Sequence, residues 1–328
     1  MRKILLTISC VSLFLLFVFL VNRQDFLPYT QEVEEQKQEE TVSILFFGDI
    51  MFDRDIRRIG SEKGYSYLFS CIKDILIKAD AVVANLEGPI TANKSVSLGS
   101  KIDTPANFQF TFDPVITDAL LLNNIGYVNI GNNHTLNFGW EGLDETRAYL
   151  SKAGIKYFGN PKIDNATTSS IAHIKLPGRI ISLINYNQFP STSAVSPPLG
   201  GLTAEISSES SKGNFVVIYA HWGEEYVPAT PSQIVAAHAF IDAGADIVIG
   251  SHPHVVQERE LYKGKYIFYS LGNFIFDQWF DDAVTHGLGV RLTWLPAYRS
   301  GRPGLQVQVE ELSLELTRDG RTCPVLDQ

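Results

Sequence analysis

The sequence predicts an α/β protein, and three observations support this prediction. From residue 42 onward, short apolar runs alternate with longer amphipathic stretches, as expected when helices pack on the faces of a sheet. Glycine closes two of the amphipathic stretches, at Gly154 and Gly244, as it does at many helix C-termini. Polar clusters directly follow several of the apolar runs, which is typical of the strand ends of α/β sheets.

The expected strands are the short apolar runs, which cover residues 42–47, 81–85, 127–130, 180–184, 215–220, 247–249 and 265–270. The expected helices are the amphipathic stretches, which cover residues 67–78, 114–123, 141–153 and 231–242. Residues 287–316 are expected to form β-structure, because apolar and polar side chains alternate in residues 305–309 and 312–316.

The N-terminus has the pattern of a membrane anchor. Arg2 and Lys3 precede an apolar run at residues 4–21. A helix needs ~17–25 residues to cross a bilayer, so this run is just long enough. No small-x-small cleavage site follows it, which favours a signal-anchor over a cleaved signal peptide. We therefore expect residues 1–23 to form one transmembrane helix in the cell membrane, with the remaining chain outside the cytoplasm.

An acidic linker is expected after the anchor. Residues 24–41 are rich in glutamate and glutamine and poor in apolar side chains, so they cannot bury enough surface to fold. Residues 42–328 then form the expected globular domain. The whole chain has 36 Asp and Glu against 27 Lys and Arg, and it shows no basic footprint of the kind that binds nucleic acid. We therefore expect no nucleic-acid partner.

The three cysteines, Cys10, Cys71 and Cys323, have no paired spacing. Cys10 lies in the apolar N-terminal run, where cysteine is usually a small hydrophobe. Cys71 and Cys323 could pair in an oxidising compartment, but nothing in their positions favours it, and we do not expect a disulfide bond between them. Nor do we expect a thiolate metal site or a cysteine nucleophile.

Candidate metal-binding side chains directly follow five of the expected strands. They are Asp49, Glu87, Asn133 with His134, His221, and the pair His252 and His254. Because ligands of α/β sheets bind at the carboxyl ends of strands, these clusters can converge on one site.

The residue types in these clusters suit a binuclear metal site. Carboxylate, amide and imidazole ligands together favour zinc, manganese or iron over calcium or magnesium. Two such ions ~3.5–4 Å apart can activate a water molecule and hold both oxygens of an in-line displacement. A carboxylate that can bridge two ions, with imidazoles around it, is what a binuclear hydrolase requires. We therefore expect two divalent ions.

Each cluster also has a structural alternative when it is considered alone. Asp49 could cap a turn or a helix, and Glu87 could lie in a surface turn. Asn133 could stabilise its own loop through a side-chain hydrogen bond. His221 could be a buried and fully hydrogen-bonded histidine. For these four clusters, metal binding becomes the stronger interpretation when all five clusters are considered together.

The remaining histidines differ in what their positions indicate. His252 and His254 flank a proline, and two imidazoles on such a rigid turn form a natural metal clamp. His173 lies on a strand-like run and His238 on an expected helix, so both are expected to be structural. The role of His286 stays open.

The order of these clusters resembles the calcineurin-like metallophosphoesterase superfamily, and in particular its CapA branch of poly-γ-glutamate capsule biosynthesis proteins. The segments that carry the resemblance are residues 48–54, 85–89, 131–139 (GNNHTLNFG), 221–223, 250–255 and 270–277 (SLGNFIFD). The resemblance implies a four-layer αββα sandwich of the metallophosphoesterase type, a β-sandwich flanked by helices.

The resemblance also implies a role for each candidate residue. The first metal would bind Asp49, Glu87 and His254, and the second would bind Glu87, Asn133, His221 and His252. Glu87 would be the bridging carboxylate, a position that is usually aspartate in the superfamily. His134 would be the catalytic histidine, which stabilises or protonates the oxygen of the leaving group.

Two departures from the superfamily pattern weaken the first metal position. The first motif usually reads Asp-x-His, but here it is Asp49-Ile50-Met51, and a thioether is a poor ligand for a borderline divalent ion. Glu87 is one methylene longer than the usual aspartate, which can change the distance between the ions.

The sequence therefore predicts a membrane-anchored, extracytoplasmic, metal-dependent hydrolase. Its expected substrate is a phosphoester or an anionic envelope polymer of the poly-γ-glutamate type, and other capsule-synthesis proteins are expected partners. One alternative is a non-catalytic, metal-dependent protein that binds the polymer and aids its assembly or export. Another is a purely structural member of an envelope complex. His134 distinguishes the first two, because a binding protein needs metal ligands but no acid–base histidine beside them.

Overall fold

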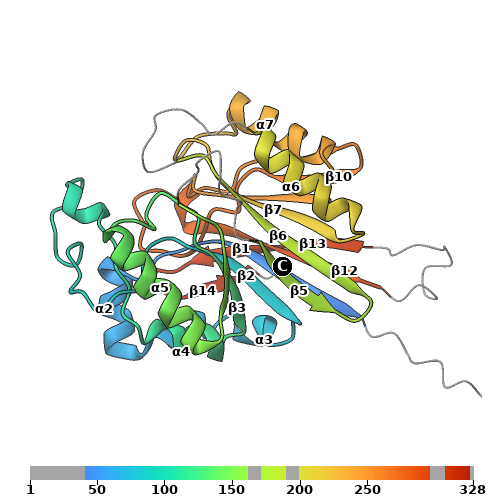
Figure 1. Cartoon of the computed structure of the whole chain (residues 1–328). Coiled ribbons are helices and arrows are strands. Elements are labelled where there is room, and N and C mark those ends of the chain that lie inside the picture. Colours follow the sequence, from blue (N-terminus) through green and yellow to red (C-terminus); the bar gives the residue numbers. More distant parts are fainter. Residues whose placement is uncertain (1–40, 162–170, 190–198, 296–306, 326–328) are drawn as a thin grey trace, which may run out of the picture. The chain divides into compact units, whose positions relative to one another are not determined.

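The structure, a computed structural model, describes residues 41–161, 171–189, 199–295 and 307–325 (Figure 1). The expected transmembrane segment at residues 1–23, and the expected linker apart from its last residue, lie outside the described residues. Within the part of the chain that is described, no helix has both the length and the apolar character needed to cross a membrane. The anchor and the linker therefore stay predictions.

The first sheet has the strand order β14-β13-β12-β1-β2-β3-β4, with the short strand β11 beside β1. Its strands are β1 (Val42–Ile50), β2 (Ala81–Leu86), β3 (Ile125–Asn129), β4 (Lys156–Phe158), β11 (Asn273–Ile275), β12 (His286–Trp294), β13 (Val307–Leu316) and β14 (Thr322–Pro324). Strands β1 to β4 are parallel, and β12 joins β1 in the antiparallel direction. The parallel strands therefore present their carboxyl ends at one edge.

The second sheet has the strand order β5-β6-β7-β8-β10-β9. Its strands are β5 (Ala172–Leu176), β6 (Arg179–Asn187), β7 (Phe215–His221), β8 (Ile247–Ser251), β9 (Arg259–Tyr262) and β10 (Lys265–Phe268). Strands β6, β7, β8 and β10 are parallel, and the two outer strands, β5 and β9, are antiparallel to their neighbours.

Helices connect the strands and cover both sheets (Figure 1). The α-helices are α2 (Arg54–Lys63), α3 (Lys73–Leu76), α4 (Ile116–Leu122), α5 (Gly139–Ala153), α6 (Gly200–Ser211) and α7 (Pro231–Asp242). The 3-10 helices are η1 (Tyr65–Phe69), η2 (Pro105–Phe108) and η3 (Ala283–Thr285). Helix α5 ends at Gly154 with φ of 81°, as the glycine in the sequence predicted.

Strand β1 is buried on both faces, because successive side chains of a strand point in opposite directions. Ile44 and Phe46 point into a core that the two sheets share, where they join Val217 of β7. Leu45 and Phe47 point into a second core, which the first sheet shares with α2, α4 and α5. A third core lies between the second sheet and helices α6 and α7. The predicted mixed α/β fold with buried strands is therefore confirmed.

One helix prediction is wrong, and two helices of the structure were not predicted. The helix expected at residues 67–78 is wrong, because η1 and α3 occupy this stretch and are separated at residues 70–72. Helix α2 was not predicted, because only Ile56, Ile59 and Gly60 of its polar sequence are buried. Helix α6 was also missed, because serine and glycine dominate its sequence and have low helix propensity.

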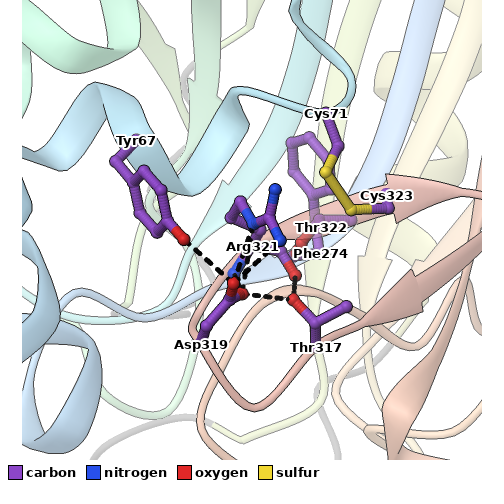
Figure 2. The surroundings of a disulfide bond; sticks show 8 residues. All are labelled: Tyr67, Cys71, Phe274, Thr317, Asp319, Arg321, Thr322 and Cys323. Atoms are coloured by element: carbon purple, nitrogen blue, oxygen red, sulfur yellow. Dashed lines mark hydrogen bonds and ion pairs between the residues drawn. A yellow bond between two sulfur atoms is a disulfide. The ribbon is translucent and has the colours of Figure 1, made fainter.

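The expectation for Cys71 and Cys323 is also wrong, because the structure joins them in a disulfide bond (Figure 2). The bond ties β14 to the segment between η1 and α3. The same region contains a polar cluster in which Asp319 accepts hydrogen bonds from Tyr67 (2.9 Å) and Thr317 (2.6 Å). The two cysteines are 252 positions apart, so only the tertiary fold brings them together.

Candidate metal centre

The predicted site residues meet at the carboxyl ends of the parallel strands of both sheets. Asp49 is the penultimate residue of β1, Glu87 directly follows β2, and the loop after β3 contains Asn133 and His134. The second sheet contributes His221, which ends β7, and the loop after β8, which contains His252 and His254. The convergence expected from the strand ends is therefore present in the fold.

Asp49 is fully buried and is fixed through both carboxylate oxygens. Its Oδ1 accepts a hydrogen bond from Nδ2 of Asn85 at 2.8 Å, and its Oδ2 accepts one from the backbone N–H of His252 at 3.0 Å. The helix-capping alternative is wrong for Asp49, since Asp53 caps α2 by accepting from the backbone N–H of Arg54. Asp49 instead links the ends of the two sheets.

Glu87 is the most unusual group of the site. Its side chain is fully buried, and neither carboxylate oxygen has a hydrogen-bond partner among the described residues. Burial, reinforced by the negative charge of Asp49, raises the pKa of the Glu87 carboxyl well above its usual range. Buried carboxylates are normally paired or bound to a metal, so this orphaned group has the character of an unfilled ligand.

Imidazoles surround Glu87. The Oε1 atom of Glu87 lies 3.7 Å from Nε2 of His254 and 3.9 Å from Nε2 of His134. One ligand atom from each of Glu87, His252 and His254 can be chosen so that all three lie within 4.8 Å of one another. In addition, Nδ1 of His252 is buried without a hydrogen-bond partner in the described part of the chain. These atoms form a cluster of acceptors that suits a divalent cation.

The backbone of the loop after β8 is held in an uncommon conformation. His252 has φ of 98° and His254 has φ of 60°, both in a region that residues other than glycine rarely occupy. Such conformations persist where the surrounding structure holds them, and they cluster at ligand sites. This geometry lets the backbone N–H of His252 contact Asp49 while both imidazoles enter the site.

His221 and Asn133 form the second group of ligands in the predicted scheme. His221 is fully buried, and its Nε2 atom lies 2.8 Å from Oδ1 of Asn133. The ring of His252 lies 4.8 Å from the ring of His221. The loop-stabilising role considered for Asn133 belongs instead to Asn132, whose Oδ1 accepts from the backbone N–H of His134 at 3.1 Å.

Burial lowers the pKa of three histidines at the site, His134, His221 and His252. The pKa values of His221 and His252 are well below the usual range, first because of burial and then because of their neighbouring imidazoles. Burial likewise lowers the pKa of His134 to about 4. These imidazoles are therefore neutral near pH 7, which is the form that binds metal ions.

Met51 belongs to the apolar core of the first sheet. Its side chain is fully buried in the core beneath the first sheet, and its sulfur accepts a hydrogen bond from the backbone N–H of Asp53 at 2.9 Å. The pairing of β1 with β11 shifts register between Asp49 and Ile50. The residue that replaces the usual imidazole is therefore a packing residue here.

Two asparagines to which the sequence analysis gave no role contact the candidate ligands. Asn85 lies between Asp49 and His221, with its Nδ2 atom 2.8 Å from the aspartate and 3.3 Å from Nδ1 of the histidine. Asn273 of β11 lies 3.0 Å from Nδ1 of His254. Both belong to segments that carry the family resemblance, but the resemblance implies no role for either residue.

The remaining histidines lie outside the site. His173 pairs with Glu209 at 2.8 Å and His238 with Glu260 at 2.9 Å, as expected for structural residues. His286 is half exposed, and its Nδ1 atom contacts the carbonyl oxygen of Asp282.

Comparisons with known proteins identify the family and several relatives of this chain. Residues 43–278 match the family described as Bacterial capsule synthesis protein PGA_cap. The chain is 31% identical over 251 residues to the PGA biosynthesis protein CapA of Bacillus subtilis (strain 168), a match that covers 73% of this chain and 64% of that protein. It is 29% identical over 301 residues to the capsule biosynthesis protein CapA of Bacillus anthracis, covering 84% and 69% of the two chains.

Among solved structures, a novel phosphatase from Mycoplasma pneumoniae covers 86% of this chain and 97% of its own, with a TM-score of 0.51 and 14% sequence identity. At this identity the likeness concerns the fold alone. The chain spans just under two thirds of the Bacillus subtilis relative, but the family match covers more than half of the chain. The chain therefore belongs to the PGA_cap family of bacterial capsule synthesis proteins.

Proposed function

We propose that this chain is a metal-dependent hydrolase of the phosphoesterase type that serves the biosynthesis of a capsule or envelope polymer. The observation that carries the proposal is the buried carboxylate of Glu87, which has no hydrogen-bond partner in the described residues and faces the imidazoles of His134 and His254. A carboxylate in such a place costs several kcal/mol unless a cation accompanies it.

The donor set fits two divalent ions such as manganese, zinc or iron. Asp49, Glu87 and His254 would hold the first ion, and Glu87, Asn133, His221 and His252 would hold the second. When bound, such ions supply an activated water molecule and stabilise the charge on the reacting oxygens. The fold proposed to carry them is the four-layer αββα sandwich of the metallophosphoesterase type, and the three separate cores support this arrangement.

His134 is the proposed acid–base residue. Its Nε2 atom faces Glu87, while its Nδ1 atom lies 3.0 Å from Oδ1 of Asn137. The ring packs against Phe110, with ring centroids 4.4 Å apart. A pKa of about 4 leaves the resting imidazole neutral, so during the reaction its Nε2 atom would take up the proton that the attacking water loses and donate it to the departing oxygen.

The proposed location is the outer side of the cell membrane. The apolar run at residues 4–21 supports a membrane anchor. The disulfide bond between Cys71 and Cys323 supports an oxidising compartment, because such bonds are rare in the cytoplasm of most organisms. The names of the two Bacillus relatives support a role in capsule synthesis, with an anionic polymer of the poly-γ-glutamate type or a phosphoester as the substrate and other capsule-synthesis proteins as partners.

A second candidate function is metal-dependent binding of the anionic polymer without catalysis. The observation that favours it is Met51, which leaves the first metal position with only three of the proposed ligands and lies in the core. A weakly held first ion would limit turnover but would still leave a cationic site for a polymer carboxylate.

The deciding experiment measures metal content and turnover of the full chain. The parent should contain divalent metal by mass spectrometry and should cleave a generic phosphodiester or poly-γ-glutamate. His134→Ala should keep its metal while turnover falls by ~10²–10⁴-fold, which is the usual share of acid–base catalysis. His286→Ala is the matched control and should be unaffected. A fully metallated parent that cleaves neither substrate but binds the polymer would favour the second candidate.

A further inference from the structure

We propose that two asparagines, Asn137 and Asn273, are positioning residues that fix which ring nitrogen of His134 and of His254 carries the proton. The functional consequence of this proposal rests on the proposed metal site. The proton positions themselves are a property of the chain alone, and they can be measured without any metal.

The hydrogen bonds around Asn273 fix the orientation of its amide. Its Nδ2 group lies 3.1 Å from the carbonyl oxygen of Val284 and 3.0 Å from Oε1 of Gln278. A carbonyl oxygen can only accept, so the amide group that faces Val284 must be the donor Nδ2. The Oδ1 atom must then face Nδ1 of His254, which lies 3.0 Å away. Because Oδ1 can only accept, Nδ1 of His254 carries the hydrogen and Nε2 keeps its lone pair.

The amide of Asn137 is also fixed by its hydrogen bonds, but here the fixed atom is the oxygen Oδ1 and not the nitrogen. The backbone N–H of Phe110 donates to Oδ1 of Asn137 at 2.8 Å, and a backbone N–H can only donate. The Nδ1 atom of His134 lies 3.0 Å from the same oxygen. His134 therefore also carries its hydrogen on Nδ1, and its Nε2 lone pair is free.

Both free lone pairs face the same carboxylate. The Nε2 atoms of His254 and His134 lie 3.7 Å and 3.9 Å from Oε1 of Glu87. No hydrogen stands between these three acceptors, so they repel one another until a cation or a proton enters. Asp49 does not fix the proton of His254 in the same way, because its Oδ2 atom lies 3.5 Å from Nδ1 of His254, beyond normal hydrogen-bond distance.

The chain places Asn273 by pairing β11 with β1. Asn273 lies opposite Asp49 in this pair, and the backbone N–H of Asp49 donates to the carbonyl oxygen of Gly272 at 3.1 Å. A Cβ atom on Gly48 would lie 1.8 Å from that oxygen, so only glycine permits this approach. The SLGNF segment therefore serves to bring an amide behind His254.

The expected effects differ between the two asparagines. Residues that orient a metal-binding histidine typically contribute 10–100-fold in affinity or activity. Asn273→Leu should weaken metal binding by about 10–100-fold, because His254 loses its preference for the Nε2 lone pair. Asn137→Leu should keep its metal, because His134 is not a proposed ligand. Its turnover should fall about 10–100-fold, because the proposed acid–base histidine loses the residue that orients it. Asn137→Asp keeps the acceptor and should restore most of the turnover.

The direct test is long-range ¹H–¹⁵N NMR of the metal-free full chain labelled at histidine, which distinguishes the two neutral forms of each ring. The parent should show the Nδ1–H form at both His134 and His254. The Leu variants should each lose this preference at their own histidine alone. Asn123→Leu, which removes another buried asparagine that donates to the Ala119 carbonyl, is the matched control and should change neither ring.

The outcomes separate this proposal from the proposed function. A parent spectrum with the Nε2–H form at either histidine overturns the assignment for that residue, without the need for any variant. Leu variants with unchanged proton positions overturn the role of the asparagines. A parent with the expected proton positions that binds no Mn²⁺ or Zn²⁺ in calorimetry would defeat the metal proposal but support the positioning role.

Discussion

The Oδ1 atom of Asn133 lies 2.8 Å from the Nε2 atom of His221, and this contact joins the loop after β3 in one sheet to the end of β7 in the other. The local sequence around each residue does not predict this contact. The contact exists because the carboxyl ends of both sets of parallel strands lie at the same side of the shared core. A single ion bound here would be held by both sheets.

The first prediction concerns this ion. Replacing His252 by alanine should remove about one equivalent of metal and lower the melting temperature, because metal-binding free energy stabilises the folded state. Metal content by mass spectrometry and melting by calorimetry check this expectation. His238→Ala is the control, since His238 pairs with Glu260 away from the site and should keep all of the metal. Unchanged metal content in His252→Ala would show that His252 is not a ligand.

The second prediction follows from the burial of Met51. The side chain is fully buried in the core beneath the first sheet, so Met51→His should bury an imidazole among apolar groups. We expect this to lower the free energy of unfolding by about 1–3 kcal/mol and to add no metal. Met51→Leu, which conserves volume, should cost less than about 1.5 kcal/mol. Denaturant unfolding and metal analysis distinguish the two, and a gain of metal in Met51→His would place residue 51 in the site.

The disulfide bond between Cys71 and Cys323 provides the third prediction. It closes a loop across 252 positions, and removal of such a bond typically costs about 2–5 kcal/mol. Cys323→Ser should therefore unfold at lower denaturant concentration than the parent. A reducing agent should destabilise the parent but not the double variant Cys71→Ser/Cys323→Ser. Equal stability of the parent under oxidising and reducing conditions would contradict a contribution of the bond to folding.

The fourth prediction concerns pH and the metal-free protein. The pKa of His134 in the folded chain is about 4, below its ordinary value of 6.5. As pH falls from 6.5 toward 4, His134 binds a proton in the unfolded chain but stays neutral in the folded chain. The free energy of unfolding therefore falls. His221 and His252 act in the same direction. The raised pKa of Glu87 acts in the opposite direction, because the folded chain takes up that proton first.

Because three histidines destabilise the folded chain as pH falls and only one carboxyl stabilises it, we expect a net loss of stability between pH 6.5 and 4. One group contributes at most about 1.4 kcal/mol per pH unit. His134→Gln should therefore flatten the pH dependence of the unfolding free energy, measured after metal removal by a chelator. His286→Gln should leave the slope as it is in the parent, because this half-exposed side chain lies outside the site. An equally steep slope in His134→Gln would show that His134 titrates normally.

Much of the fold and the candidate site could be predicted from local sequence. Buried parallel strands require continuous apolar runs, and ligand-binding side chains follow such runs at their carboxyl ends. The places of Asp49, Glu87 and His221 at strand ends could therefore be predicted from local sequence, and so could the helix closed by Gly154. Helices with few apolar residues, such as α2 and α6, could not be predicted, because tertiary packing stabilises them rather than their own composition.

By itself the sequence determined which side chains stand at the strand ends and therefore which ligands are available. The tertiary structure decided which of them meet and how they are oriented. It placed Asn133 against His221 and joined Cys71 to Cys323, and a register shift beside β11 accompanies the burial of Met51 in the core. The physical reason is that apolar patterning acts over a few neighbouring residues, whereas these contacts join segments distant in sequence and depend on how two sheets pack face to face.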